Sequence, residues 1–314
     1  MSDQSPLTSP GGPYQWPRSP DYQTARPPEA LPPRLPRIHV ILFLATVLTT
    51  LVAGAMQQGI NPLATPWLIY KGIPFSFTLL LILFCHEMGH YLASRWHHLD
   101  VTLPYFIPAP PIPFIIGTLG AYIRIRSPIQ DKRALMDVGA SGPLVGLVVT
   151  IPILALGLKF SEVRLILPGL GEPGGFMLGE CLLFKLISWL VVGDLPKNYH
   201  IFLHPMAFAG WLGLFVTNLN LIPIGQLDGG HVSYALFGDR SRGIAKIFYG
   251  FLLICGLVGW VGWLVWAVLL YFMGFFHPQP LHDWLPLDRP RQWIGAITIV
   301  VFIITFTPVP MQGF

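Results

Sequence analysis

The stretch "LILFCHEMGHYLAS", residues 81–94, places two histidines and a glutamate among leucine, isoleucine and phenylalanine side chains. The apolar run around it covers residues 74–96, and roughly 17 to 25 apolar residues suffice for a helix to cross a bilayer. Ionisable groups at membrane depth are energetically costly and usually have a function. The stretch therefore predicts a transmembrane helix that carries a functional site.

The rest of the chain has the composition of a membrane protein. Of its 314 residues, 53% are hydrophobic and 11% are charged, whereas about 25% are charged in an ordinary soluble domain. We expect an all-α polytopic fold in a lipid bilayer, and nothing in the sequence indicates binding to nucleic acid. The apolar runs predict six transmembrane spans, near residues 38–56, 74–96, 134–158, 200–222, 244–273 and 292–308.

The segment before the first span has a different composition. Residues 1–37 contain ten prolines and no apolar run, so they are expected to be a disordered cytoplasmic tail. Residues 38–314 form the predicted membrane domain. In an alternating six-span arrangement, the side of the N-terminus carries more Lys and Arg than the other side, which places both termini in the cytoplasm. Because no transit peptide is recognisable, we expect a bacterial inner membrane, with an organelle membrane as the alternative.

Two segments between the spans depart from the transmembrane pattern. Residues 101–128 are broken by prolines. Within them "GTLGAYIRIR" (117–126) has the composition of a strand, with which "LPYFIP" (103–108) can pair. Irregular backbone at membrane depth must be buried in protein or line a wet cavity, so we expect a re-entrant β-hairpin beside the functional site. The apolar stretch 176–193 contains two charges and is expected to lie on the membrane surface as an amphipathic helix.

The functional motif in the opening stretch is HExxH, formed by His86, Glu87 and His90. Residues four apart share one face of a helix, so the two imidazoles can bind one metal ion. Glu87 can then take a proton from a water that the ion activates. With ten His and five Glu in the chain, composition alone gives about 0.005 expected occurrences of this motif. The pattern predicts a catalytic site for one zinc ion.

A catalytic zinc site needs a third protein ligand and an open position for water. The best candidate is Asp228 in "TNLNLIPIGQLDGGH", residues 217–231. Pro223 and Gly225 should break the helix there and leave Asp228 on a flexible loop that turns inward. His231 is a rival third ligand, which spacing alone does not exclude.

Together, these motifs resemble the site-2 protease family of intramembrane zinc metalloproteases. The similarity comprises HExxH on an apolar helix, the "GTLGAYIRI" that follows it and the N-x-x-P-x-x-x-x-DGG run, and it covers roughly residues 74–240. It implies that Asp228 is the third zinc ligand, that Glu87 is the general base and that Asn220 helps to hold substrate or the oxyanion. Many members carry a PDZ or CBS domain, and we expect a minimal form without either.

The resemblance also implies a substrate class, namely single-pass transmembrane proteins cleaved within or near their membrane segment in regulated intramembrane proteolysis. An unwound substrate segment can pair with the edge of the "GTLGAYIRI" strand by β-augmentation, which would bring it to Gly117 and Gly120. The sequence does not indicate the oligomeric state. Two other functions stay open: a divalent-metal transporter, which also uses intramembrane His and Asp but leaves Glu87 unexplained, and an inactive protease-like scaffold.

The remaining polar residues have structural interpretations. Asp137 is expected to stabilise the N-terminus of the third span, where a carboxylate suits the helix dipole. Small residues further along that span are expected to let helices approach closely. His204, His277 and His282 are expected on the opposite side of the membrane from the zinc.

Overall fold

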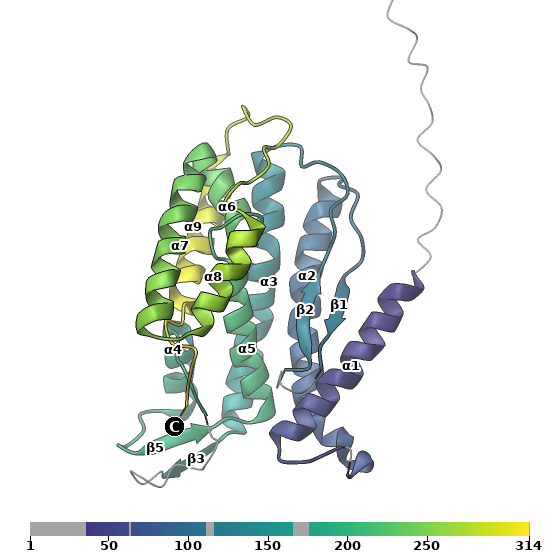
Figure 1. The fold of residues 1–314 in the computed structure, drawn as a ribbon, viewed down its shortest axis with the longest axis vertical. Helices are drawn as coiled ribbons and strands as arrows, with labels where there is room; N and C mark the ends of the chain where they lie inside the picture. The colour runs from purple at the N-terminus through teal and green to yellow at the C-terminus, as the bar shows by residue number, and fades with distance from the viewer. Residues whose placement is uncertain (1–35, 63, 111–115, 166–175, 314) are drawn as a thin grey trace, which may run out of the picture. The chain divides into compact units, whose positions relative to one another are not determined.

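The computed structural model describes residues 36–62, 64–110, 116–165 and 176–313 (Figure 1). Up to residue 35, the predicted tail lies outside the described residues. Residues Arg37–Phe314 form a compact unit of their own, and its helical, membrane-type character confirms the predicted fold class.

The first three predicted spans are present as long helices. They are α1 (Arg37–Gln57), α2 (Ile73–Trp96), which follows the short 3-10 helix η1 (Pro66–Gly72), and α3 (Lys132–Lys159). In α2, Gly89 lies against the carbonyl oxygen of Ser141 in α3, where a Cβ would have no room. This close approach lets α2 pack along α3, and α5 (Pro205–Asn220) completes the centre of the bundle. The apolar core lies among these helices and includes Leu79, Leu154 and Trp211.

The two strands predicted in the segment that connects α2 to α3 pair with each other, as expected. Strand β1 (Tyr105–Pro108) runs antiparallel to β2 (Thr118–Tyr122), with Tyr105 opposite Tyr122. The pair packs against α1, and His39 of α1 bonds to the carbonyl oxygen of Pro104. Residues 111–115, between the strands, lie outside the described residues. Insertion of this pair into the membrane stays a prediction.

The chain breaks after α5, as Pro223 and Gly225 predict. Helix α5 ends at Asn220, and α6 (Asp228–Phe237) begins after a non-helical segment. Asp228 is therefore the first residue of a helix, and the expectation that it lies on a flexible loop is wrong. Gly229 and Gly230 instead allow close packing, because a Cβ on either would overlap backbone oxygens of the preceding segment.

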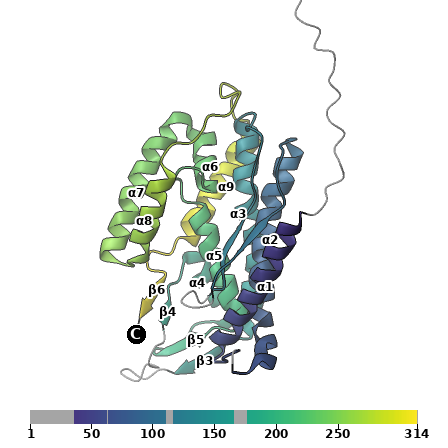
Figure 2. The same cartoon turned by 45° about the vertical axis from the view of Figure 1, so that its right-hand side comes forward.

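Residues 244–273, predicted as a single span, do not form one continuous helix. This part of the chain forms two helices, α7 (Ser241–Val258), which follows the 3-10 helix η2 (Gly238–Arg240), and α8 (Gly262–Met273). The two helices pack side by side, with Gly256 against Leu264, so the chain reverses direction between them (Figures 1 and 2). The apolar composition continues through the turn, which is why hydropathy did not reveal it.

Helix α9 (Arg289–Thr305) and short elements complete the fold. At one end of the bundle, β3 (Glu162–Leu165) pairs with β5 (Tyr199–Phe202). Near the C-terminus, β6 (Met311–Gly313) pairs with β4 (Phe176–Leu178) (Figure 2). Of the stretch expected to be amphipathic, α4 (Leu182–Val192) is helical and packs against α3 and α9. Its location on a membrane surface stays a prediction.

Within the described part of the chain, four helical segments are long and apolar enough to cross a membrane. They are Arg37–Gln57, Pro66–Trp96, Lys132–Lys159 and Asp228–Val258. Helices α5 and α9 have 16 and 17 residues and fall just short of this length. The number of six spans therefore stays a prediction.

Candidate metal centre

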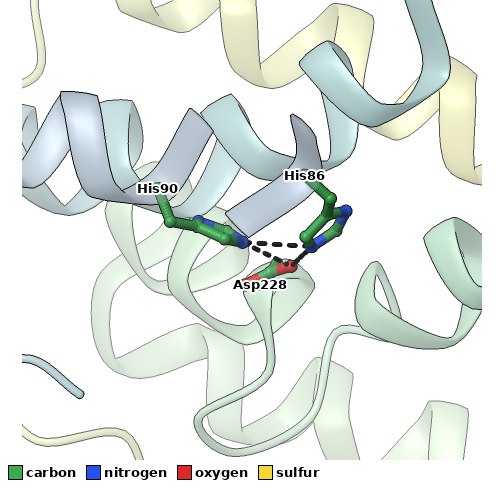
Figure 3. A group of neighbouring side chains, drawn as sticks. All are labelled: His86, His90 and Asp228. Carbon is green, nitrogen blue, oxygen red and sulfur yellow. Dashed lines mark hydrogen bonds and ion pairs between the residues drawn. The ribbon is translucent and has the colours of Figure 1, made fainter. Parts of the chain in front are cut away.

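Two histidines of α2 and one aspartate of α6 converge inside the bundle (Figure 3). His86 and His90 lie one helical turn apart and are 3% and 6% exposed. The Nε2 atoms of the two rings are 3.1 Å apart. The Oδ2 atom of Asp228 lies 3.4 Å from Nε2 of His86 and 3.3 Å from Nε2 of His90. The structure thus brings together all three residues proposed as metal ligands.

The spacing of these atoms fits a zinc ion. Zinc binds imidazole nitrogen and carboxylate oxygen at about 2.0 to 2.2 Å in a tetrahedral arrangement, which separates ligand atoms by about 3.3 to 3.5 Å. The two separations from Asp228, 3.3 and 3.4 Å, match that spacing, and the separation between the two imidazole nitrogens, 3.1 Å, is slightly shorter. Two histidines and one carboxylate are also a donor set of catalytic zinc sites, which keep one further position for water or substrate.

The neighbouring helix α3 orients both imidazoles. The Nδ1 atom of His90 donates a hydrogen bond to the carbonyl oxygen of Val138, at 2.7 Å. This bond fixes the tautomer and leaves Nε2 free to bind the ion. A Cβ on Gly142 would occupy the place of the His90 ring, and one on Gly146 would contact the ring of His86. The glycines expected to serve helix packing therefore make room for the two imidazole rings of the candidate metal centre.

Glu87 lies next to the first of the metal-binding histidines and is 5% exposed. The backbone of Ile123, the residue after β2, lies close to its carboxylate. The end of the strand pair therefore lies beside the carboxylate proposed as general base. The backbone contacts at Val138 and Ile123 could not be predicted from the sequence, because every residue type carries the same backbone groups.

The three residues proposed to contact substrate, Asn220, Gly117 and Gly120, have different surroundings in the structure. The Nδ2 atom of Asn220 donates to Nε2 of His86, at 3.2 Å. Gly117 lies against the backbone of Thr49 in α1 with φ of +76°, which gives it a packing role. Gly120, in β2, has φ of +102° and open space beside it. Contact of these three residues with a substrate stays a prediction.

His231, the rival ligand, is not part of the group of possible metal ligands found among the described residues. Its Nδ1 atom instead lies 2.6 Å from Nε2 of His277. His277 and His282 lie at the same end of the bundle as the metal group, because the backbone of His282 bonds to Gln130, just before α3. The prediction that they lie on the opposite side is wrong for both, whereas His204 lies at the other end of α3, next to Ser161.

Asp137 has a role that the sequence did not indicate. It is the sixth residue of α3, and the N-cap of that helix is Asp131, which accepts bonds from Arg133 and Ala134. The carboxylate of Asp137 instead accepts three contacts of 2.6 to 2.9 Å from Arg291 of α9. It also lies 2.7 Å from Nε2 of His97, directly after α2. This ionic cluster joins three helices close to the metal group.

The site and fold define a class of metal centre, an HExxH helix completed by a distant aspartate within a bundle of apolar helices. Comparison with known proteins agrees with this class. The model of peptidase family M50 matches residues 74–257. The chain therefore belongs to peptidase family M50, the site-2 protease family, which is a family of zinc metalloproteases.

Curated relatives come from plants. The chain is 29% identical to the probable zinc metalloprotease EGY1, chloroplastic, of Oryza sativa subsp. japonica, over 77% of this chain and 41% of the relative. It is 27% identical to the protein of the same name from Arabidopsis thaliana, over 87% of this chain and 53% of the relative. It is 32% identical to the probable zinc metalloprotease EGY2, chloroplastic, of Oryza sativa subsp. indica, over 76% of this chain and 42% of the relative. The chain spans about half the length of the curated relatives it matches.

Proposed function

We propose that this protein is an intramembrane zinc metalloprotease that hydrolyses peptide bonds within or near transmembrane segments. The observation that carries the proposal is the convergence of His86, His90 and Asp228 at tetrahedral spacing inside a bundle of membrane-type helices. The names of the curated relatives, probable zinc metalloproteases, support it.

The residues around the metal group have the positions that peptide hydrolysis requires. A zinc ion supplies Lewis-acid polarisation of the scissile carbonyl and lowers the pKa of a water toward about 7. Glu87 is adjacent to a ligand and can accept the proton of that water and later deliver it to the leaving amine. When the His86 nitrogen binds the ion, the amide of Asn220 loses its present acceptor and becomes available to a substrate carbonyl.

The substrates that we propose are single-pass transmembrane proteins, cleaved in regulated intramembrane proteolysis. Their helices must be unwound locally before attack, and an unwound segment can add to β2 as a further strand. The strand leads directly to Ile123, whose backbone contacts Glu87. Proline substitutions along residues 117–125 should therefore reduce cleavage while zinc binding is unchanged, and they should do so more than alanine substitutions at 118, 119 and 122–125, the positions that are neither glycine nor alanine. Equal cleavage by both sets of variants would exclude pairing with this strand.

The decisive experiment substitutes Glu87→Gln, which preserves the size of the side chain and removes the base. We expect purified protein to retain one zinc ion per chain and cleavage to fall by about 10² to 10⁴-fold. The matched control is Glu180→Gln, because Glu180 pairs with Lys185 outside the metal group. Candidate substrates are single-pass proteins that accumulate in the membrane proteome of cells carrying Glu87→Gln.

The same variants separate the two rival functions. A divalent-metal transporter predicts that Glu87→Gln alters metal uptake and abolishes no cleavage. A non-catalytic scaffold predicts that the wild-type protein neither retains zinc nor cleaves membrane proteins.

We propose that the protein acts within a membrane and that its N-terminus lies in the cytoplasm or, in an organelle, in the compartment that the organelle membrane encloses. The relatives are named chloroplastic, which weighs against the expected bacterial inner membrane.

A further inference from the structure

The first turn of α6 presents Asp228 to the two histidines, yet few side-chain contacts hold this turn in place. No side chain caps the start of this helix. The next two residues are Gly229 and Gly230, which offer no side chain for packing. His231 is therefore the first residue after Asp228 with a side chain, and it lies three positions further on, on the same face of the helix.

The ring of His231 is held by a specific hydrogen bond. The Nδ1 atom of His277 lies 2.7 Å from the carbonyl oxygen of Pro278, which can only accept, so this nitrogen carries the hydrogen. Burial lowers the pKa of His277 below its ordinary value, which favours a neutral ring. Its Nε2 atom is then an acceptor, and Nδ1 of His231 donates to it across 2.6 Å. The bond thus has one defined direction.

His277 is itself fixed by the segment between α8 and α9, residues 274–288. The segment begins at Gly274, whose carbonyl oxygen lies against Gly225 in the break before α6. Further along, the backbone of Leu281 bonds to Ile129, and Lys132 of α3 bonds to Asp283. His277 is 7% exposed, and its ring stacks on that of Tyr234 in α6 at 4.8 Å. These contacts fix residues 274–288 against the bundle, and through His277 they fix the ring of His231.

We propose that His277 is a positioning residue for the metal centre, which acts through His231 to hold the first turn of α6 so that Asp228 reaches the ion. The inference rests on the proposed function only in requiring that the protein binds zinc. It assigns to the segment between α8 and α9 a role in the metal site, although it contributes no ligand. The residue acts by geometry, so its loss should weaken and distort metal binding without removing a donor atom.

The test compares three substitutions of His277 in full-length protein purified in detergent. His277→Phe keeps a ring against Tyr234 and removes the acceptor. His277→Gln places an amide oxygen near the position of Nε2 and keeps the acceptor, whereas His277→Asn is too short to reach His231. The matched control is His282→Phe, because the ring of His282 contacts Trp284 rather than α6.

Two readouts are measured on the folded fraction: zinc affinity, by competition with a chromophoric chelator, and the visible spectrum of the Co²⁺-substituted site. We expect His277→Phe and His277→Asn to weaken zinc binding about tenfold and to change the Co²⁺ spectrum, within the range seen for residues that orient metal ligands. His277→Gln and His282→Phe should resemble wild type.

Wild-type affinity and spectrum in both His277→Phe and His277→Asn would overturn the inference. If His277→Phe does not fold, His277→Asn alone decides, since it retains polarity and the reach to Pro278. Absence of zinc binding by the wild-type protein would instead contradict the proposed function, so the two failures are distinguishable.

Discussion

At the scale of single residues, helical periodicity explains why the HExxH motif was so informative. Positions four apart must share a face, so the pairing of His86 with His90 follows from their spacing alone. The approach of Asp228 depends on how α5 ends and α6 begins; the break at Pro223 and Gly225 made it a candidate, and the resemblance to a family favoured it over His231. Contacts such as that of His90 with the Val138 carbonyl could not be predicted, because the backbone carries no residue-specific signal.

The space for the His90 ring depends on one glycine. We expect Gly142→Ala to weaken zinc binding and to destabilise the protein by about 1 to 3 kcal/mol, the usual cost of overpacking. The reason is that an added Cβ would occupy the position of the imidazole, which has no other place to go. Zinc content and thermal unfolding in detergent measure the two effects.

The control for this change is Gly250→Ala in α7, where an added Cβ meets nothing within 4 Å. There the same substitution should leave zinc content unchanged and stability equal or higher, since alanine favours helix over glycine by about 1 kcal/mol. Equal zinc content and melting temperature in the two variants would contradict the proposed crowding at His90.

At the scale of elements, the central helices were predictable and their ionic connections were not. The apolar runs located α1, α2 and α3 within a few residues, because bilayer thickness sets a length that hydropathy reveals. Arg291 and Asp137 are separated by 154 positions, and no pattern along the chain relates them. The turn between α7 and α8 escaped prediction for a related reason, since its residues are as apolar as the helices they join.

The cluster of Asp137 should stabilise the bundle more than a surface ion pair does. The side chains of Arg291 and Asp137 are 24% and 21% exposed, so removal of the carboxylate leaves a partly buried guanidinium with Asp288 as its remaining carboxylate partner. We expect Asp137→Asn to cost about 2 to 3 kcal/mol, somewhat less than the 3 to 5 kcal/mol for a fully buried pair. Denaturant titration in mixed micelles measures this loss.

The comparison is Glu162→Gln, which breaks the pair of Glu162 with Arg164 on β3. Those side chains are 66% and 54% exposed, and exposed pairs contribute about 0 to 1 kcal/mol. A loss for Asp137→Asn no larger than for Glu162→Gln would show that the cluster does not hold the three helices together.

At the scale of the whole molecule, the reversal between α7 and α8 changes the expected topology. If α7 and α8 form a hairpin in place of one span, the number of crossings changes by one, and every later segment lies on the opposite side of the membrane from that expected. In the structure, Arg291 at the start of α9 contacts Asp137 near the start of α3, while β6 at the C-terminus pairs with β4 near the other end of the bundle. Helix α1 begins beside the strand pair that follows α2, since His39 bonds to Pro104, and its last turns lie against η1, which leads into α2. We therefore predict that the two termini lie on opposite sides of the membrane, in place of the six-span expectation that both lie on one side.

The charge distribution supports this predicted topology. Arg289 and Arg291 now join the end that carries Arg95, Lys132 and the basic start of α7. The other end retains few basic residues, namely Lys71, Lys159, Arg164, Lys185 and Lys197. The asymmetry is stronger than in the six-span arrangement, and by the positive-inside rule it places the richer end in the cytoplasm.

We therefore expect reporters fused before Met1 and after Phe314 to lie on opposite sides of the membrane, with the N-terminal one in the cytoplasm. Single cysteines at His282 and Asn198, in a background without the three native cysteines, provide an independent measurement with a membrane-impermeant reagent. The cysteine at 282 should be protected in sealed cells, as the N-terminus is, and the cysteine at 198 should be labelled. Two fusion reporters on the same side would mean that residues 241–273 cross the membrane an odd number of times, which the antiparallel packing of α7 on α8 does not allow.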